Sequence, residues 1–223
     1  MMATFDAVCF DMDGVTVETA AAWYEIERNH VLPSAIATGN PPPDAIRALG
    51  VDDAYDRLRS LDGITLAVDR ETFRALYEER VDEVYRERAT LMPGYLDLLE
   101  TLAFDGLALG LVSASQRAWV EIVLDRFDLH DAYDRVVGAD DIEGPSKPDP
   151  GIYEHAAERL GVAPKQTVAV EDSPHGIAAA TAAGMYCIAL RGDGNAEADL
   201  SAADTVVTEP VALRSELRAL TTK

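Results

Sequence analysis

Apolar and polar positions are spaced in two different ways along the chain, and the spacing divides it into an α/β part and a helical part. The apolar run from Phe5 to Phe10 predicts a short buried strand near the N-terminus. From Met92 onward, segments of helical spacing alternate with short apolar runs. Helices are expected over residues 94–103, 116–127, 150–160, 174–183 and after 207, and strands at 111–112, 135–137, 167–170, 186–190 and 205–207. Strands that alternate with helices predict a parallel α/β sheet.

Residues 18 to 90 show a different pattern, with helical spacing and no evident strand. Helices are expected over residues 18–37, 44–49, 52–61 and 70–88. The first strand belongs to the same sheet as the later ones, so the helical segment is inserted into the α/β part. The predicted fold is therefore a Rossmann-like parallel α/β core, residues 1–15 and 93–223, with an all-helical inserted domain, residues 16–92.

Length, hydropathy and cysteine content indicate an ordinary globular protein. The chain has 223 residues and a mean hydropathy of -0.05, and no apolar stretch approaches the roughly 20 residues of a membrane span. The start of the chain does not resemble a secretory signal, which predicts a cytoplasmic protein. The two cysteines, Cys9 and Cys187, lie in apolar strand-like runs and are expected to be buried free thiols, with no zinc site.

The net charge of -21 is large for a chain of this length. It argues against nucleic acids and anionic membranes as partners, because both would repel the protein. Only three lysines are present, Lys147, Lys165 and Lys223. An acidic, lysine-poor surface resembles proteins of salt-accumulating halophiles, where high ionic strength screens self-repulsion. Melting curves in low salt and in molar KCl test this hypothesis.

The first strand is followed directly by Asp11-Met12-Asp13-Gly14. Carboxylates at the C-terminal end of a strand lie where open α/β sheets bind their ligands. Two like charges that close repel each other, so one of them must bind a cation or hold a proton. Glycine at position 14 lets the backbone turn sharply beside a bound group. The alternative is a solvated turn, since Asp-x-Asp-Gly is also ordinary turn chemistry.

Polar residues of matching chemistry occur at three further places, Ser113 with Ser115, Lys147, and Glu171-Asp172. Converging strand ends would bring them close to the first motif. Together they fit phosphoryl transfer: Asp11 or Asp13 could attack phosphorus, and Asp172 with one of that pair could hold Mg²⁺. Ser113 could donate a hydrogen bond to phosphate and Lys147 could neutralise it. Taken singly, Ser113 fits a turn, Lys147 fits a solvated loop, and Ser173-Pro174 fits the start of a helix.

The same four segments resemble the motifs of the haloacid dehalogenase (HAD) superfamily in order and spacing. They are Asp11-Met12-Asp13-Gly14-Val15, Leu111-Val112-Ser113-Ala114-Ser115, Ser146-Lys147-Pro148 and Val170-Glu171-Asp172-Ser173-Pro174-His175-Gly176-Ile177. The helical insertion resembles the C1 cap of this superfamily. The subgroup that the chain resembles includes β-phosphoglucomutase, phosphoglycolate phosphatase and small sugar-phosphate phosphatases.

The resemblance implies a role for each motif residue. Asp11 would be the nucleophile and a Mg²⁺ ligand, and Asp13 the general acid and then base, with its backbone carbonyl on the metal. Asp172 would complete the metal ligands, and Glu171 would support the metal's water shell. A final group would hold the phosphoryl oxygens: Ser113, Ala114 and Lys147. The implied function is Mg²⁺-dependent hydrolysis of a small phosphorylated metabolite, of sugar phosphate or phosphoglycolate type, through an aspartyl phosphate.

Two other activities within the superfamily are disfavoured and one stays open. Asp13 argues against dehalogenation, and the absence of lysine from residues 15 to 92 argues against the phosphonatase branch. A β-phosphoglucomutase-like mutase is the alternative, although Pro41-Pro42-Pro43 replaces an expected arginine, for which Arg28 or Arg47 could substitute.

Two departures from the family pattern, Glu18-Thr19 and Gly151, remove no catalytic group. A non-catalytic phosphate-binding protein on this fold is the second alternative. The identity of the metabolite, the oligomeric state and the position of the loop at 191–204 are not predicted.

Overall fold

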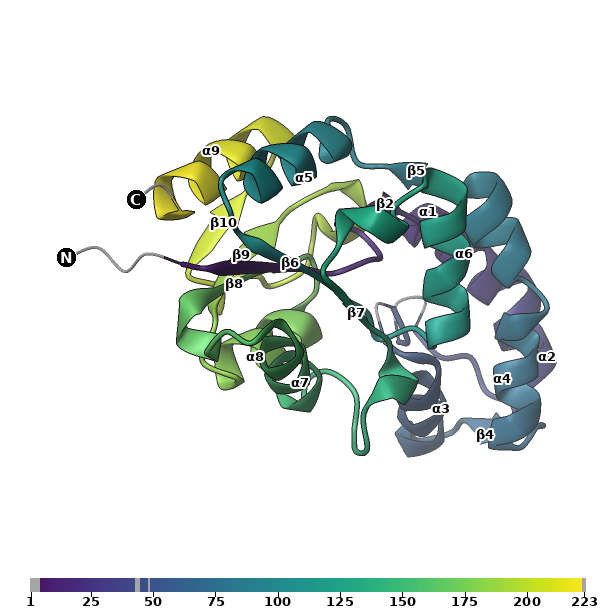
Figure 1. Cartoon of the computed structure of the whole chain (residues 1–223). Coiled ribbons are helices and arrows are strands. Elements are labelled where there is room, and N and C mark those ends of the chain that lie inside the picture. Colours follow the sequence, from purple (N-terminus) through teal and green to yellow (C-terminus); the bar gives the residue numbers. More distant parts are fainter. Residues whose placement is uncertain (1–4, 43–44, 48, 222–223) are drawn as a thin grey trace. The chain divides into compact units, whose positions relative to one another are not determined.

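The computed structural model describes residues 5–42, 45–47 and 49–221. These residues form two compact units, each of which is described by itself. The core unit contains the chain up to Glu18 and from Thr90 onward, and the helical unit contains Thr19–Ala89. Figure 1 shows the chain coloured along its sequence.

A six-stranded parallel sheet forms the centre of the core unit. Its strands are β1 (Ala7–Phe10), β6 (Ala108–Val112), β7 (Arg135–Val137), β8 (Thr167–Glu171), β9 (Tyr186–Leu190) and β10 (Thr205–Val207). Their order is β10-β9-β8-β1-β6-β7, and every neighbouring pair is parallel. The α/β fold predicted from the sequence is therefore confirmed.

Helices cover both faces of this sheet, α5 and α9 on one face and α7 and α8 on the other (Figure 1). The helices of the core unit are α5 (Tyr95–Phe104), α6 (Arg117–Phe127), α7 (Gly151–Leu160), α8 (Pro174–Ala182) and α9 (Pro210–Thr221). Short 3₁₀ turns lie between them at η3 (His130–Ala132), η4 (Ala139–Asp141), η5 (Pro164–Gln166) and η6 (Asp193–Asn195). A parallel sheet covered on both faces buries nearly whole strands, which explains the continuous apolar runs in the sequence. Cys9 and Cys187 are buried free thiols in β1 and β9, as predicted.

The order of the strands creates a switch point at β1. From β1 the sheet continues through β6 to β7 on one side, and through β8 to β9 and β10 on the other. The carboxyl ends of β1, β6 and β8 are therefore neighbours at the place where open α/β sheets bind ligands. All four polar motifs follow these strands or lie in a loop that reaches them.

The chain leaves and re-enters the core unit through a pair of short strands. These are β2 (Val17–Glu18) and β5 (Thr90–Leu91), which pair in antiparallel fashion with Val17 opposite Leu91 and Glu18 opposite Thr90.

The helical unit consists of short helices and two very short strands. Its elements are α1 (Ala20–Ile26), η1 (Glu27–Val31), α2 (Leu32–Ala35), β3 (Ile36–Thr38), α3 (Val51–Ser60), β4 (Thr65–Leu66), α4 (Arg70–Glu78) and η2 (Glu83–Arg88). The segments η1 and η2 are π-helical.

Three expectations for this region need correction. The unit is not all-helical, because β3 and β4 form an antiparallel pair; two or three residues are too few to show strand alternation in the sequence. The long helix expected at 18–37 is divided by the π-helical segment η1, and the one at 70–88 ends at Glu78 and resumes as η2. The short helix expected at 44–49 includes residues 44 and 48, outside the described residues, and 45–47 form turns.

No helix in the described part of the chain is both long and apolar enough to cross a membrane.

Candidate active site

The loop after β1 is held in shape by its own hydrogen bonds. The Thr16 hydroxyl donates to the backbone carbonyl of Asp11 at 2.7 Å. The amides of Thr16 and Val17 both donate to the carbonyl of Met12, at 3.0 and 2.9 Å. This tight turn leaves the Asp11 side chain buried, with 7% of the residue exposed, at the carboxyl end of β1. Asp13 lies further out and is only partly buried.

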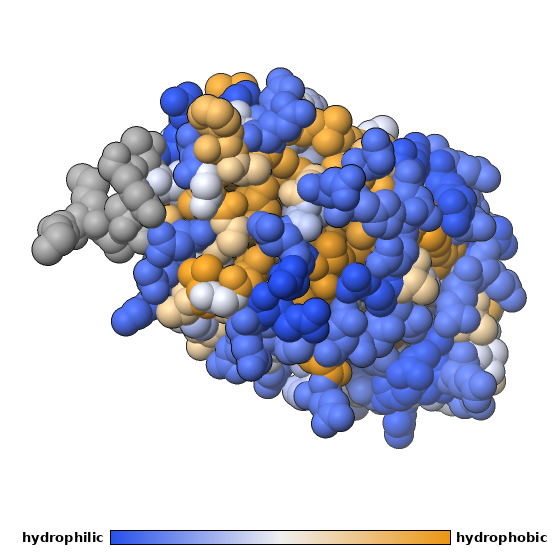
Figure 2. Space-filling model, viewed as in Figure 1, coloured by the Kyte–Doolittle hydropathy of each residue, from blue (hydrophilic) through white to orange (hydrophobic). Residues whose placement is uncertain are grey.

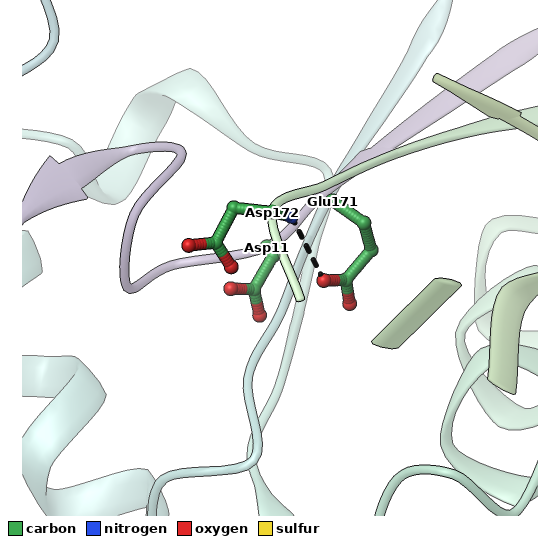
Figure 3. A group of neighbouring side chains, drawn as sticks. All are labelled: Asp11, Glu171 and Asp172. Atoms are coloured by element: carbon green, nitrogen blue, oxygen red, sulfur yellow. Dashed lines mark hydrogen bonds between the residues drawn. The ribbon is translucent and has the colours of Figure 1, made fainter. Parts of the chain in front are cut away.

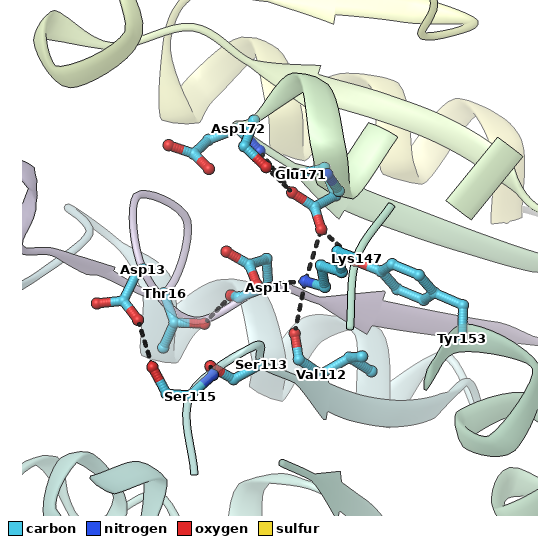
Figure 4. A network of polar contacts seen from close by, with 12 residues as sticks. Asp11, Asp13, Thr16, Val112, Ser113, Ser115, Lys147, Tyr153, Glu171 and Asp172 are labelled. Atoms are coloured by element: carbon cyan, nitrogen blue, oxygen red, sulfur yellow. Dashed lines mark hydrogen bonds and ion pairs between the residues drawn. The ribbon is translucent and has the colours of Figure 1, made fainter. Parts of the chain in front are cut away.

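Lys147 contacts residues of the three other motifs through a buried ammonium group (Figure 4). Its Nζ donates to Asp11 Oδ1 at 2.6 Å, to Glu171 Oε1 at 2.7 Å and to the carbonyl oxygen of Val112 at 3.1 Å. All three N–H donors of the lysine are therefore used. Burial would lower the pKa of Lys147, but the Asp11 and Glu171 carboxylates together raise it above its ordinary value. The lysine is charged and is not a solvated loop residue.

Tyr153, in the first half of α7, completes this network and was not identified from the sequence. Its hydroxyl donates to Glu171 Oε1 at 2.6 Å, and Lys147 Nζ lies 5.0 Å from the centre of its ring. Burial and the nearby carboxylates raise the pKa of Tyr153 well above its ordinary value, so the hydroxyl stays protonated and donates. The sequence signal was weak, since an aromatic residue on the apolar face of a helix usually indicates only the core.

Three carboxylates meet beside Lys147, and they come from two strand ends. One oxygen each of Asp11, Glu171 and Asp172 lies within 4.8 Å of the others (Figure 3). Burial raises the pKa of Asp11 to about 7, with Lys147 opposing and Glu171 adding to the rise. Burial, followed by the charges of Asp11 and Glu171, raises the pKa of Asp172 well above its ordinary value. A cation would relieve this repulsion.

Gly14 and Gly176 allow these carboxylates to approach the backbone. A Cβ atom at Gly14, whose φ is 86°, would lie 2.0 Å from Asp172 Oδ2. A Cβ atom at Gly176 would lie 2.0 Å from the carboxylate of Glu171. Any side chain at either position would displace a carboxylate.

The loop after β6 places Ser113 and Ser115 on the side of Asp11 opposite Asp172 (Figure 4). The Ser113 Oγ accepts a hydrogen bond from the Ser115 amide at 3.0 Å, and its own proton has no acceptor among the described residues. The Ser115 hydroxyl contacts Asp13 Oδ2 at 3.4 Å (Figure 4). Ser113 can therefore donate to a ligand, while Ala114 lies between the two serines with its backbone amide in the same turn.

The third motif and its neighbour add two further observations. The peptide between Lys147 and Pro148 is cis. The Ser146 Oγ is buried without a hydrogen-bond partner among the described residues.

The segment after β8 is both a helix start and part of the site. The Ser173 Oγ accepts the Gly176 amide at 3.0 Å, and Pro174 is the first residue of α8, as the sequence predicted. The loop at 191–204 contacts this segment, because Asn195 Nδ2 donates to the Asp172 carbonyl at 2.7 Å. The sequence alone does not predict the position of that loop.

The donor set fits a hard divalent cation. Carboxylate oxygens are the protein ligands that Mg²⁺ prefers. The pKa values of Asp11 and Asp172 are raised first by burial, with neighbouring carboxylates adding to the rise and Lys147 opposing it. Asp13 contributes no side-chain oxygen to this group of three. The arrangement also offers a buried carboxylate, Asp11, beside an ammonium group and a serine hydroxyl that can donate.

The chain is similar to known proteins over most of its length. The family model for haloacid dehalogenase-like hydrolases matches residues 8–190. The phosphorylated carbohydrates phosphatase of Thermotoga maritima is 30% identical over 81% of this chain and 82% of its own. Hexitol phosphatase B of Escherichia coli is 32% identical over 82% of both chains.

Among solved structures, CbbY of Rhodobacter sphaeroides in complex with xylulose-(1,5)bisphosphate is 25% identical. It covers 92% of this chain and 95% of its own with a TM-score of 0.75. A family match over most of the chain, with relatives of at least 30% identity, establishes the relationship. The chain belongs to the haloacid dehalogenase-like hydrolases.

Proposed function

We propose that this protein is a Mg²⁺-dependent phosphatase for a small phosphorylated metabolite of the sugar phosphate or phosphoglycolate type. Its reaction passes through an aspartyl phosphate, a mixed anhydride formed on Asp11. The relatives named above are phosphatases of phosphorylated carbohydrates and hexitols, which supports this substrate class.

One observation supports the proposal above the others. The buried carboxylate of Asp11 is bonded to the ammonium of Lys147 and lies within 4.8 Å of Glu171 and Asp172 at the switch point of the sheet. A structural ion pair does not need two further carboxylates beside it, since each adds repulsion. The arrangement fits a nucleophile next to a phosphate-binding lysine and a cation site.

The proposed reaction has two steps. In the first, an Asp11 oxygen bonds to phosphorus, the bond from phosphorus to the alcohol oxygen breaks, and Asp13 gives its proton to that oxygen. In the second, Asp13 takes a proton from water, the water oxygen bonds to phosphorus, and Asp11 is released with inorganic phosphate. Two easier displacements replace one difficult displacement.

The other side chains position and neutralise the phosphoryl group. Ser113 donates its free hydroxyl proton to a phosphoryl oxygen, and Ala114 offers its backbone amide. Lys147 supplies positive charge and is held in place by Glu171, which Tyr153 orients. Mg²⁺, held by Asp11, Asp172 and the Asp13 carbonyl with Glu171 behind them, would neutralise negative charge on the phosphoryl oxygens.

We further propose that the inserted segment, residues 16–92 in the sequence-based division, is the C1 cap that selects the substrate. The segment contains a partly buried acid, Glu27, and an aromatic cluster of Trp23, Phe73 and Tyr77. These side chains are chemically unlike the motif residues of the core unit. Large phosphorylated partners such as proteins and nucleic acids are not proposed as substrates.

The composition supports a proposal about where the enzyme works. A net charge of -21 with few lysines fits a cytoplasm of high ionic strength, and two buried free thiols fit a reducing compartment. The assay should therefore contain high KCl.

The test is release of inorganic phosphate with Mg²⁺ in high KCl from a panel of phosphate esters. The panel contains para-nitrophenyl phosphate, phosphoglycolate, sugar monophosphates and β-glucose 1-phosphate. Asp11→Asn should lower turnover by at least about 10³-fold while the protein remains folded. Asp97→Asn, the same change on the exposed surface of α5, should leave turnover unchanged, and EDTA should abolish it.

Three outcomes would contradict the proposal. An unchanged rate in Asp11→Asn would exclude Asp11 as the nucleophile. Conversion of β-glucose 1-phosphate to the 6-phosphate with a bisphosphate primer, without net phosphate release, would favour the mutase. If a folded protein that binds Mg²⁺ shows neither activity, the result would favour a phosphate-binding protein.

A further inference from the structure

A groove lies along the open edge of the sheet, away from the four motifs. Its volume is about 590 Å³, and its walls come from α6, the outer strand β7 and α7. None of the motif side chains lines it. Its charged lining includes Arg117, Glu121, Asp134, Arg135, His155 and Arg159. The volume is within the range of about 300–1,000 Å³ typical of small-molecule sites.

Two arginines of this groove have no carboxylate partner among the described residues. The Arg135 Nε donates to the backbone carbonyl of Arg159 at 3.0 Å, and its Nη1 donates to the carbonyl of Asp134. Carbonyl partners fix this guanidinium but do not cancel its charge. Arg159, one turn further along α7 than His155, forms no ion pair within the described part of the chain. The hydrogen bond from Arg135 keeps the two residues next to each other.

A third arginine shows how the charged lining is otherwise balanced. Arg117 pairs with Glu121 at 2.7 Å and with Asp141 at 3.1 Å, and its Nη1 donates to the carbonyl of Val136 at 2.6 Å. Arg117 therefore provides a hydrogen-bond donor for a backbone carbonyl of the edge strand β7, and two carboxylates neutralise its charge. The acid that remains, Asp134, accepts the Leu109 amide at 2.8 Å. Asp134 keeps its negative charge in the groove, and Arg135 and Arg159 are the arginines of the lining that no carboxylate pairs among the described residues.

The same two arginines also line a second, neighbouring hollow. Its volume is about 430 Å³, and its other walls include the apolar residues Leu107 and Leu160. In Figure 2, strongly hydrophilic side chains gather near the middle of the visible face, beside a hydrophobic patch. A ligand that contacts the two arginines can place an organic part against Leu107 and Leu160, which line the same hollow.

The surroundings make this pair of arginines unusual. The chain has a net charge of -21, so an anion is repelled by most of its surface. Guanidinium groups suit a phosphate monoester, which carries a charge of roughly -1.5 to -2 and oxygens that accept from their N–H donors, and Arg135 and Arg159 line the same groove. We propose that this groove is a second ligand site, which binds a small phosphorylated molecule through Arg135 and Arg159. The site is separate from the proposed active site and does not depend on its assignment.

The test is a titration of the ¹⁵N-labelled protein with inorganic phosphate, followed by backbone amide resonances. KCl is held at a concentration where the protein is folded. Resonances of residues 134–136 and 155–159 report on the groove, and those of residues 11–16 and 113–115 report on the active site. We expect both groups to shift in the wild-type protein. Arg159→Ala should weaken the response of the groove at least tenfold and leave that of the active site unchanged.

Two further variants make the result specific. Lys165→Ala removes one exposed positive charge from the same unit and should leave both responses unchanged. Arg135→Ala with Arg159→Ala should abolish the groove response; if that variant does not fold, Arg159→Ala alone decides. Shifts confined to residues 11–16 and 113–115, or equal weakening by Lys165→Ala, would overturn the proposal.

Discussion

The core unit and the helical unit both contain ion pairs, but among the described residues the buried pairs are found in the core unit. In the helical unit, Arg74 pairs with Asp52 at 2.7 Å, and the two side chains are 42% and 48% exposed. In the core unit, Lys147 pairs with Glu171 at the same distance of 2.7 Å, and the side chains are 5% and 0% exposed. Ion pairs of the same length are therefore exposed to water in one unit and buried in the other.

This difference separates stability from function. An exposed pair contributes roughly 0–1 kcal/mol and is screened by salt. A buried pair must offset a desolvation cost of several kcal/mol, so it is weak evidence for stability alone. Its persistence in the core unit, beside two further carboxylates, is better explained by a chemical task. Four experiments test this contrast.

The largest effect is expected from Lys147→Met. The substitution keeps a similar volume but leaves Asp11 and Glu171 buried without their cation. We expect a loss of about 3–5 kcal/mol in unfolding free energy, together with loss of phosphatase activity. Urea unfolding and phosphate release measure the two effects. Lys165→Met, at an exposed lysine, should change stability by less than about 0.5 kcal/mol. Equal losses in the two variants would remove the distinction between buried and exposed charge.

Tyr153→Phe should have an intermediate effect. It removes one hydrogen bond from the buried Glu171 carboxylate and leaves the aromatic packing in place. We expect a loss of about 1.5–3 kcal/mol in urea unfolding, because the acceptor is charged. Tyr55→Phe is the matched control in the helical unit, where the hydroxyl makes only a long contact of 3.4 Å to the Val68 carbonyl. A larger loss in the control would contradict the ranking.

Glu27 extends the comparison to a partly buried acid inside the helical unit. The Tyr77 hydroxyl donates to its Oε1 at 3.1 Å. Burial raises the pKa of Glu27 from 4.5 to about 7, against the lowering effects of Tyr77 and Arg47. The folded state then binds the proton more tightly than the unfolded state, so this group's contribution to stability decreases as pH rises from about 4.5 to about 7.

The wild type should therefore lose unfolding free energy between pH 5 and pH 8 because of this group. Glu27→Gln should lose about 1–2 kcal/mol less than the wild type over the same pH range. Thermal melts at the two pH values measure the difference. Glu78→Gln, on the exposed surface of α4, should show no such change. A pH dependence identical to that of the wild type in Glu27→Gln would exclude this assignment.

The smallest effect is expected from Arg74→Ala, which removes an exposed pair with Asp52. The loss should be about 0.2–1 kcal/mol in low salt and should shrink in molar KCl. Arg57→Ala, an exposed arginine of α3 without an ion pair among the described residues, is the control. A loss that persists in molar KCl would show that this surface network resembles the buried one.

The sheet and the motif positions could be predicted from the sequence for a physical reason. Strands buried on both faces appear as apolar runs such as Phe5 to Phe10, and the chemistry follows directly at their carboxyl ends. Asp11, Ser113 and Glu171 are therefore local features of strand ends. The start of α8 at Ser173-Pro174 is also local, since a cap depends on neighbouring residues only.

The parts that could not be predicted depend on contacts between distant segments. Tyr153 reaches Glu171 only because α7 packs against the sheet, and helical spacing alone does not distinguish it from a core residue. The β3–β4 pair is too short to leave a pattern, and its strands meet only after the intervening chain has folded. The groove beside β7 combines residues of three elements, and none of them forms a motif.

The β2–β5 pair has a consequence for how this protein can change over evolutionary time. Because Glu18 lies opposite Thr90, the inserted segment begins and ends at one point, and the sheet is hydrogen-bonded without it. Insertions whose ends meet are tolerated because they leave the host's backbone pairing intact. The segment between Glu18 and Thr90 can therefore be exchanged without breaking a hydrogen bond of the six-stranded sheet. A change in its length leaves the hydrogen-bonded pairing of β1 with β6 and β8 at the switch point intact.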